Sequence, residues 1–276
     1  MAIRYERYER RPSVTGSNFR SMETAGALDA QLLATTGLQA FWDFHPDRIT
    51  AGTNQSIANR VNGGTALVED ASYSNLVVDR DEAPPGGTMI RHGKFAADTV
   101  LTMTGFPSAA NSVWTLAGCF KMDEPTALGA ITQYMIQGPN GSTSNHWLYL
   151  STTLLTHRIG TAGSYLDIYD RHAIGVWNFF FAMYNNTSKA SRIVCNGTAP
   201  PASGIATGTT QSALQAALQV GGNASAMSLA FKGKLGPLLL WSGTSDATGN
   251  LFDASRAADL SLAAKFFRAQ IGRLSL

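Results

Sequence analysis

The chain has 276 residues, of which 44% are hydrophobic and 14% are charged, and its formal net charge is +2. That length suits one large β-domain or two small ones, and it is enough to bury a sizeable core. Most of the positive excess lies in the amino-terminal segment, so the rest of the chain is nearly neutral. We therefore expect no nucleic-acid partner and no attraction to an anionic membrane.

The sequence shows neither a targeting signal nor the spacing that is typical of reactive cysteines. No apolar run approaches the ~20 residues that a membrane helix needs, and the start, MAIRYERYERRP, lacks the apolar stretch of a secretory signal. We expect the chain to stay in a cytoplasm or to leave it by another route. Cys119 and Cys195 lie in separate strand-like runs without a CxxC pattern, so we expect two buried free thiols.

Residues 1–36 form the first predicted zone, an arm that contains one short helix. It opens with the repeat RYERYERR, which is typical of a solvated segment. Two interpretations stay open: a disordered terminus, or an arm that folds onto a partner protein. We favour the partner because docking surfaces are rich in arginine and aromatic side chains. The predicted docking residues are Arg4, Tyr5, Arg7, Tyr8, Arg10 and Arg11.

A short helix is predicted at the end of this arm. In the stretch METAGALDAQLLATTG, Leu28 and Leu32 are spaced i, i+4, and Gly37 follows as a helix stop. We expect this helix to lean on the body of the protein.

Residues 37–250 form the second zone, a strand-rich body. The run VWTLAGCFKM (113–122) alternates with a period of two, which predicts a half-buried antiparallel strand. WNFFFAMYNNTSKASRIVCNG (177–197) predicts a hairpin, and its Asn196-Gly197 pair is a turn signal that admits positive φ. Pro237, in a later strand, cannot donate a ladder hydrogen bond and so predicts an edge or a bulge.

The order of these elements indicates the fold class. Short strands follow one another with polar turns and no helices between them, which predicts an all-β, antiparallel two-sheet jelly-roll sandwich. The third zone, residues 251–276, contains an apolar stripe at helical spacing and predicts a helix that packs on the body. Its stripe residues are Leu260, Ala264, Phe267 and Ile271.

Several of these pieces, in this order, resemble the laminin-G-like branch of the concanavalin A-like jelly rolls. The similar segments are GLQAFWDF, HGKFAADTVLTM, SVWTLAGCFKM, GVWNFFFAMYNNTSKASRIVCNGT and LQVGG with FKGKLGPLLLWSG, within residues 37–243. The resemblance implies that the hairpin is central scaffold whose aromatic side chains, Trp177 and Phe179 among them, fill the space between two sheets. It also implies that loops at one rim bind sugars or protein surfaces, in some members with calcium.

Catalytic patterns are not found. Relatives of this architecture that hydrolyse glycosides resemble one another in two glutamates that bracket an aspartate on one strand, which supplies the paired carboxylates of a retaining mechanism. The six glutamates of this chain show no such pattern, and the G-x-S-x-G, phosphate-loop and H-E-x-x-H motifs are absent. We therefore expect no enzymatic activity and no cofactor.

Two loops have chemistry suited to recognition, QGPNGSTSNHW (137–147) and GTAGSYLDIYDRH (160–172). Aromatic faces can stack on sugar rings while amides and carboxylates bond hydroxyls. The predicted ligand-binding residues are Asn140, Asn145, His146, Tyr165, Asp167, Tyr169 and Asp170. The alternative is that these are ordinary polar loops with half-buried aromatics. Two aspartates are too few for calcium, so no metal ligand is predicted.

Three functions follow, in decreasing order of support. The first is a non-enzymatic structural or adhesive surface protein of a large assembly, such as a bacteriophage virion decoration, tail or fibre component. It would be present in many copies, hold its neighbours through the arm and recognise surface glycans or proteins. The second is a free bacterial carbohydrate-binding module, and the third is a glycoside hydrolase.

Overall fold

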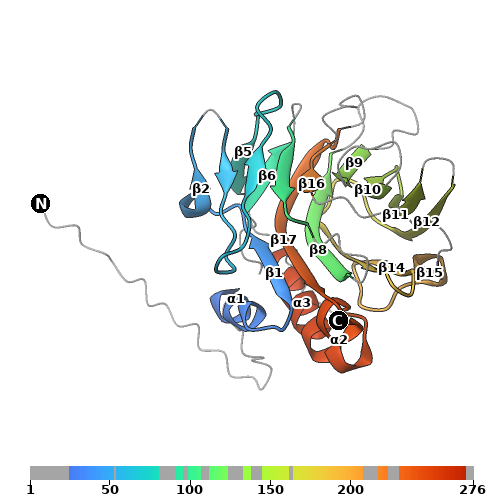
Figure 1. Cartoon of the computed structure of the whole chain (residues 1–276). Helices are drawn as coiled ribbons and strands as arrows, with labels where there is room; N and C mark the ends of the chain where they lie inside the picture. The colour runs from blue at the N-terminus through green and yellow to red at the C-terminus, as the bar shows by residue number, and fades with distance from the viewer. Residues whose placement is uncertain are drawn as a thin grey trace, which may run out of the picture.

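The computed structural model describes residues 25–52, 54–80, 91–95, 99–106, 112–123, 133–137, 145–161, 164–207, 217–222 and 230–271. Two antiparallel β-sheets pack face to face, and helices lie against the outer face of one of them (Figure 1). The predicted all-β antiparallel sandwich with a C-terminal helix is confirmed.

Sheet A is the eight-stranded sheet. Its strands pair in the order β15-β14-β13-β8-β17-β6-β5, and β1 also pairs with β17. Their bounds are β1 Leu38–Trp42, β5 Val77–Arg80, β6 Arg91–Phe95, β8 Val113–Met122, β13 Asn178–Asn185, β14 Ala190–Cys195, β15 Ile205–Thr207 and β17 Gly233–Gly243.

Sheet B is the nine-stranded sheet, in the order β12-β11-β10-β9-β16-β7-β4-β3-β2. Its bounds are β2 Ile49–Thr50, β3 Ser56–Ile57, β4 Leu67–Glu69, β7 Leu101–Thr104, β9 Gln133–Gln137, β10 Asn145–Leu150, β11 Leu154–Thr161, β12 Ser164–Arg171 and β16 Ala217–Val220. The helices are α1 Ala25–Leu33, α2 Asp246–Gly249 and α3 Ala257–Ile271, with short 3₁₀ turns η1 Pro46–Arg48, η2 Ala202–Gly204 and η4 Ala254–Arg256. Among the described residues, no helix is both long enough and apolar enough to cross a membrane.

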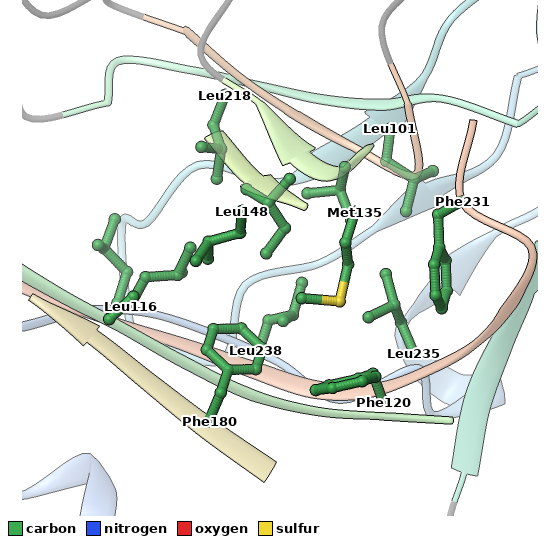
Figure 2. Close-up of a cluster of buried hydrophobic side chains, with 14 of the residues drawn as sticks. Leu101, Leu116, Phe120, Met135, Leu148, Phe180, Leu218, Phe231, Leu235 and Leu238 are labelled. Carbon is green, nitrogen blue, oxygen red and sulfur yellow. The ribbon is translucent and has the colours of Figure 1, made fainter. Parts of the chain in front are cut away.

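The main core lies between the two sheets (Figure 2). Sheet A contributes Phe120, Phe180 and Leu238, and sheet B contributes Leu148 and Leu218 from the opposite side. Because side chains alternate along a strand, the neighbours of these residues point to the outer faces of the sheets. What covers each outer face therefore decides what the protein can present to a partner.

A second core lies between the outer face of sheet A and the helices. Phe267 of α3 stacks on Phe179 of β13, with ring centroids 6.0 Å apart and an interplanar angle of 8°. The prediction that the hairpin's Trp177 and Phe179 fill the space between the sheets is wrong, because both belong to this second cluster. The prediction of a half-buried strand at 113–122 is also wrong: β8 is buried on both faces, since helices cover its outer side.

Local signals in the hairpin and in β17 are confirmed. Asn196 has φ 59° after β14, and its side chain accepts a hydrogen bond from the Phe179 backbone N–H at 3.1 Å. This bond extends the pairing of β13 and β14 by one residue at the open end of the hairpin, opposite its turn, and the left-handed backbone of Asn196 ends the strand there. In β17 the pairing with β8 shifts register between Leu235 and Leu238, which places Pro237 at an irregularity of the ladder.

Polar contacts fasten α1 and the segment after it to the body. Buried Arg256 donates to the Thr36 carbonyl at 2.8 Å, and the Trp241 indole N–H donates to the Thr35 hydroxyl at 2.9 Å. Arg60 pairs with Asp29 of α1. With Leu28 and Leu32 buried in the second core, α1 is held on the outer side of sheet A.

Candidate binding surface

Residues 164–171 form strand β12, not the loop that the sequence predicted. β12 pairs with β11 along its whole length, from Leu154 with Arg171 to Thr161 with Ser164. The segment SYLDIYDR alternates polar or aromatic residues with aliphatic ones, which is the period of a half-buried strand. Tyr165, Asp167 and Tyr169 therefore lie on one face of sheet B.

An ion pair joins β12 to β11 on this outer face. Arg158 Nε donates to Asp167 Oδ1 at 2.7 Å, and Arg158 Nη2 donates to Oδ2 at 2.6 Å. The Tyr149 hydroxyl, from β10, donates to Asp167 Oδ2 at 3.1 Å and accepts from Arg158 Nη2 at 3.2 Å. The two parallel N–H bonds fix the plane of the guanidinium, so three strands share one rigid polar cluster.

Tyrosine rings surround this cluster. The Arg158 guanidinium carbon lies 4.1 Å from the centroid of the Tyr165 ring and 5.1 Å from that of Tyr149. Tyr149 in turn meets Tyr134 of β9 edge to face, with centroids 6.2 Å apart. We call the set Tyr134, Tyr149, Arg158, Tyr165 and Asp167 the tyrosine platform. Tyr165 is 51% exposed although Arg158 covers one side of its ring, so its other side faces solvent.

Tyr134, Tyr149 and Arg158 of the platform have pKa values raised above their ordinary values. Burial raises the pKa of the Tyr149 hydroxyl above 10, and the Asp167 carboxylate raises it further. Burial also raises the pKa of Tyr134. The hydrogen bond to Asp167 raises the pKa of Arg158, so the guanidinium stays charged and paired. None of these shifts brings a group close to pH 7, where general acid–base catalysis is most effective.

Asp170 and Asp167 lie on opposite faces of β12. Asp170 Oδ2 accepts the backbone N–H of Cys195 at 2.7 Å, which ties the edge of sheet B to β14 of sheet A. The sequence predicted both aspartates as ligand-binding, but Asp170 has this structural bond. Tyr169, 41% exposed, lies on the same face as Tyr165.

Two of the remaining predicted site residues have only their backbone described, and the others lie outside the described residues. Asn145 and His146 begin strand β10 and are thus not in a loop, and their side chains are outside the described residues, as is Asn140. The arm residues Arg4, Tyr5, Arg7, Tyr8, Arg10 and Arg11 also lie outside them.

Three members of the platform, Tyr134, Tyr149 and Arg158, were not predicted from the sequence. A signal existed for Tyr149, since HWLYLS alternates and places it on the face opposite Leu148 and Leu150. What joins it to Arg158 and Tyr134 is the strand pairing, which a single sequence does not specify. Among the described residues, no group of three or more His, Cys, Asp or Glu side chains could hold a metal ion.

Comparison with known proteins shows the fold and no family. No family model matches the sequence, and no curated protein matches it. The binding domain of botulinum neurotoxin DC, solved in complex with SialylT, is similar with a TM-score of 0.55 and 7% identity over 85% of this chain and 52% of that chain. The same domain in complex with rat synaptotagmin II gives 0.54 and 7% over 82% and 52%.

A mutant of Trypanosoma rangeli sialidase displaying trans-sialidase activity is similar with a TM-score of 0.53 and 14% identity, over 87% of this chain and 38% of that one. The chain thus spans about half the length of the toxin domains and less of the sialidase. At these identities the likeness shows the β-sandwich fold.

Proposed function

We propose that this protein is a non-enzymatic recognition module that binds a surface glycan through the tyrosine platform on the outer face of sheet B. The observation that carries the proposal is the contrast between the two outer faces. Helices cover that of sheet A, whereas the outer face of sheet B carries the half-exposed ring of Tyr165 in a fixed polar frame.

The chemistry of the platform suits a sugar ring. A pyranose has a face of weakly positive C–H groups that packs on the negative face of an aromatic ring, and hydroxyls at its edge that need hydrogen-bond partners. The Tyr165 ring offers the first, and the carboxylate and hydroxyl oxygens of Asp167 and Tyr149 offer the second. Because β-strands hold these groups, little conformational freedom is lost on binding.

Known structures of the same fold are compatible with this role. The toxin binding domains were solved with SialylT in one case and with rat synaptotagmin II in another. A laminin-G-like relationship, which the sequence motifs favour, would agree with either ligand class. We place glycans first because the platform is small and polar, whereas a protein interface is usually built around a larger apolar core.

Within this proposal, the module belongs to a large multi-copy assembly, with a bacteriophage virion decoration, tail or fibre as the favoured setting. Its arm would dock it to other proteins of the assembly. The tyrosines and arginines of the arm supply the docking chemistry.

Two alternative functions would place different demands on the structure than the proposed assembly module does. A free bacterial carbohydrate-binding module would share the platform but need no docking arm. A glycoside hydrolase would need a pair of carboxylates about 5.5 Å apart that are free to act as nucleophile and acid. Asp167, the carboxylate of the platform, is held by Arg158 and Tyr149, which favours binding over catalysis.

The test is a multivalent display of the full chain on an array of bacterial surface glycans, with and without calcium. Multivalency raises the avidity of weak single sites by roughly 10²–10⁴. We expect a specific signal that Tyr165→Ala reduces at least about tenfold, as for loss of one stacking contact. Val77→Ala, an exposed residue of sheet A, is the matched control and should bind like wild type.

A clean blank across the array, or equal binding by the Tyr165→Ala variant, would contradict the platform as a glycan site. The assembly role is tested separately by deleting residues 1–24. Loss of partner capture with retained glycan binding supports the docking arm, and unchanged capture and oligomeric state contradict it.

A further inference from the structure

Strand β12 carries a second exposed tyrosine beside the platform. Tyr165 is 51% exposed and Tyr169 is 41% exposed, and within the described part of the chain no other aromatic side chain is exposed. The other large apolar side chains exposed in that part are aliphatic, and each lies on a different element or loop. The exposed aromatic rings that the structure describes are therefore gathered on one strand.

The regular pairing of β12 fixes how these two tyrosines lie. β12 pairs with β11 along its whole length without a shift of register. Leu166 and Ile168 pack in the core between the sheets. Because side chains alternate along a strand, Tyr165, Asp167 and Tyr169 all project from the outer face. Four steps of about 3.3 Å along the strand place the two tyrosines about 13 Å apart.

Asp167 lies between the two tyrosines and is held in place. Its carboxylate accepts two hydrogen bonds from Arg158 and one from the Tyr149 hydroxyl. A carboxylate has about four acceptor sites on its two oxygens, and the Asp167 side chain is 33% exposed. A hydroxyl group above the strand can therefore still donate to it. We call Tyr165, Asp167 and Tyr169 the β12 strip.

Exposure of the aromatic side chains decreases from β12 toward the middle of sheet B. Tyr149 of β10 and Tyr134 of β9 are only partly exposed, and their rings meet edge to face. A ligand that ran across the strands would leave the exposed rings behind and meet these more buried ones. A ligand that runs along β12 stays in contact with both exposed tyrosines.

We infer that the ligand is a linear glycan that lies along β12 and spans at least three sugar units, with one ring on Tyr165, another on Tyr169 and a unit between them over Asp167. Adjacent sugar rings are joined through a single oxygen, so their centres lie less than half of the ~13 Å between the tyrosines apart. A monosaccharide or a disaccharide therefore reaches only one of the two rings. This inference rests on the proposed function and adds the direction and the minimum length of the ligand.

The two stacking positions predict a dependence of affinity on chain length. A ligand already held on Tyr165 has lost most of its translational freedom, so contact with Tyr169 adds to binding at little further entropic cost. Affinity should thus increase in one step, at the length that first reaches both rings.

The experiment is isothermal titration calorimetry of the full chain with ladders of linear oligosaccharides, from the monosaccharide to the hexasaccharide. The probes are the ladders of cellulose, chitin, xylan, arabinan, galactan and polysialic acid. Tyr169→Ala removes the second ring, and Tyr169→Leu replaces it with an apolar side chain that has no aromatic face. Tyr169→Phe is the matched control because it keeps the ring, and thermal unfolding of each variant checks that it is folded.

We expect at least one ladder to bind, with an affinity that increases about tenfold between the disaccharide and the trisaccharide, as for one added stacking contact. Tyr169→Ala and Tyr169→Leu should bind the trisaccharide and longer members as weakly as the disaccharide. Tyr169→Phe should keep the step, and Tyr165→Ala should weaken binding at every length.

Three results would overturn the β12 strip and leave the proposed function standing. One is a ladder whose monosaccharide binds as tightly as its hexasaccharide, and another is a Tyr169→Ala variant that binds the trisaccharide like wild type. The third is a specific signal on the glycan array without binding of any linear ladder. No binding of any ladder together with a blank array would remove the proposed function and the strip with it.

Discussion

The outer face of sheet A carries the rings of Phe179 and Phe181, whereas the outer face of sheet B carries those of Tyr149 and Tyr165. On sheet A the rings meet Phe267 of α3 and form a second core. On sheet B the rings meet Arg158 and remain half-buried or exposed. Both outer faces carry aromatic rings. The rings on sheet A lack the hydroxyl group that the rings on sheet B have, and helices cover only the face of sheet A among the described residues.

This difference shows how one sandwich can have a covered outer face and a partly open one. A phenyl ring left in water is unfavourable and drives burial against another element. A tyrosine keeps a polar end that can remain hydrated or bonded, so its face can stay open without an equal penalty. The outer face of sheet A is thereby committed to internal packing, whereas Tyr165 and Tyr169 on the outer face of sheet B stay exposed to solvent.

The largest expected effect is on the covered face. Phe267→Ala removes a ring that stacks on Phe179 and meets Phe181 edge to face, and it should lower the free energy of unfolding by about 3–5 kcal/mol. Urea unfolding followed by tryptophan fluorescence measures this, with Phe267→Leu as the control at about 1–1.5 kcal/mol. A loss below about 1 kcal/mol for the alanine variant would mean that α3 is not part of the cooperative core.

A second effect concerns the inner side of β11, directly beside Arg158. His157 is buried against Trp114, with ring centroids 5.6 Å apart, and burial lowers its pKa to about 3. In the unfolded chain this histidine binds a proton near pH 6.5. The unfolded state therefore binds more protons between about pH 6.5 and 3, so stability falls as the pH is lowered through that window.

Between pH 7.5 and 4.5 the contribution of His157 should cost about 2–3 kcal/mol of unfolding free energy. The His157→Leu variant should lose this part of the acid slope, and urea unfolding at the two pH values compares the proteins. A His157→Leu variant with the full wild-type slope would place the acid sensitivity in other groups.

The smallest effects separate the two faces of β12. Asp170→Ala removes the acceptor of the Cys195 backbone N–H. It should lower the free energy of unfolding by about 1–3 kcal/mol with no change in glycan binding. Asp167→Asn breaks the ion pair with Arg158, whose two side chains are 23% and 33% exposed. It should therefore lower the free energy of unfolding by less than about 1 kcal/mol. Its effect should instead appear as weaker ligand binding. Thermal unfolding and the glycan array together measure both, and a reversal of the two patterns would contradict the assignment of faces.

Many strands and helices could be predicted from the sequence, because the spacing of apolar residues along the chain indicates the type of element. The alternation in β8 and β13, the turn at Asn196 and the stripe of α3 all correspond to elements of the structure. The burial of β8 and β13 on both faces could not be predicted, because it depends on helices at the two ends of the chain, α1 and α3, folding onto the same face of sheet A.

The proposed binding surface divides in the same way. The residue types at Tyr165 and Asp167 already indicated recognition chemistry, because an exposed aromatic ring beside a carboxylate suits a sugar or a protein surface. The sequence placed them in a loop, while the structure shows a strand in register with β11, and that register brings Arg158 and Tyr149 to them. Periodicity along a strand is a local property that the sequence by itself determines, whereas the choice of neighbouring strands and of the covered face is a long-range property that the tertiary structure decides.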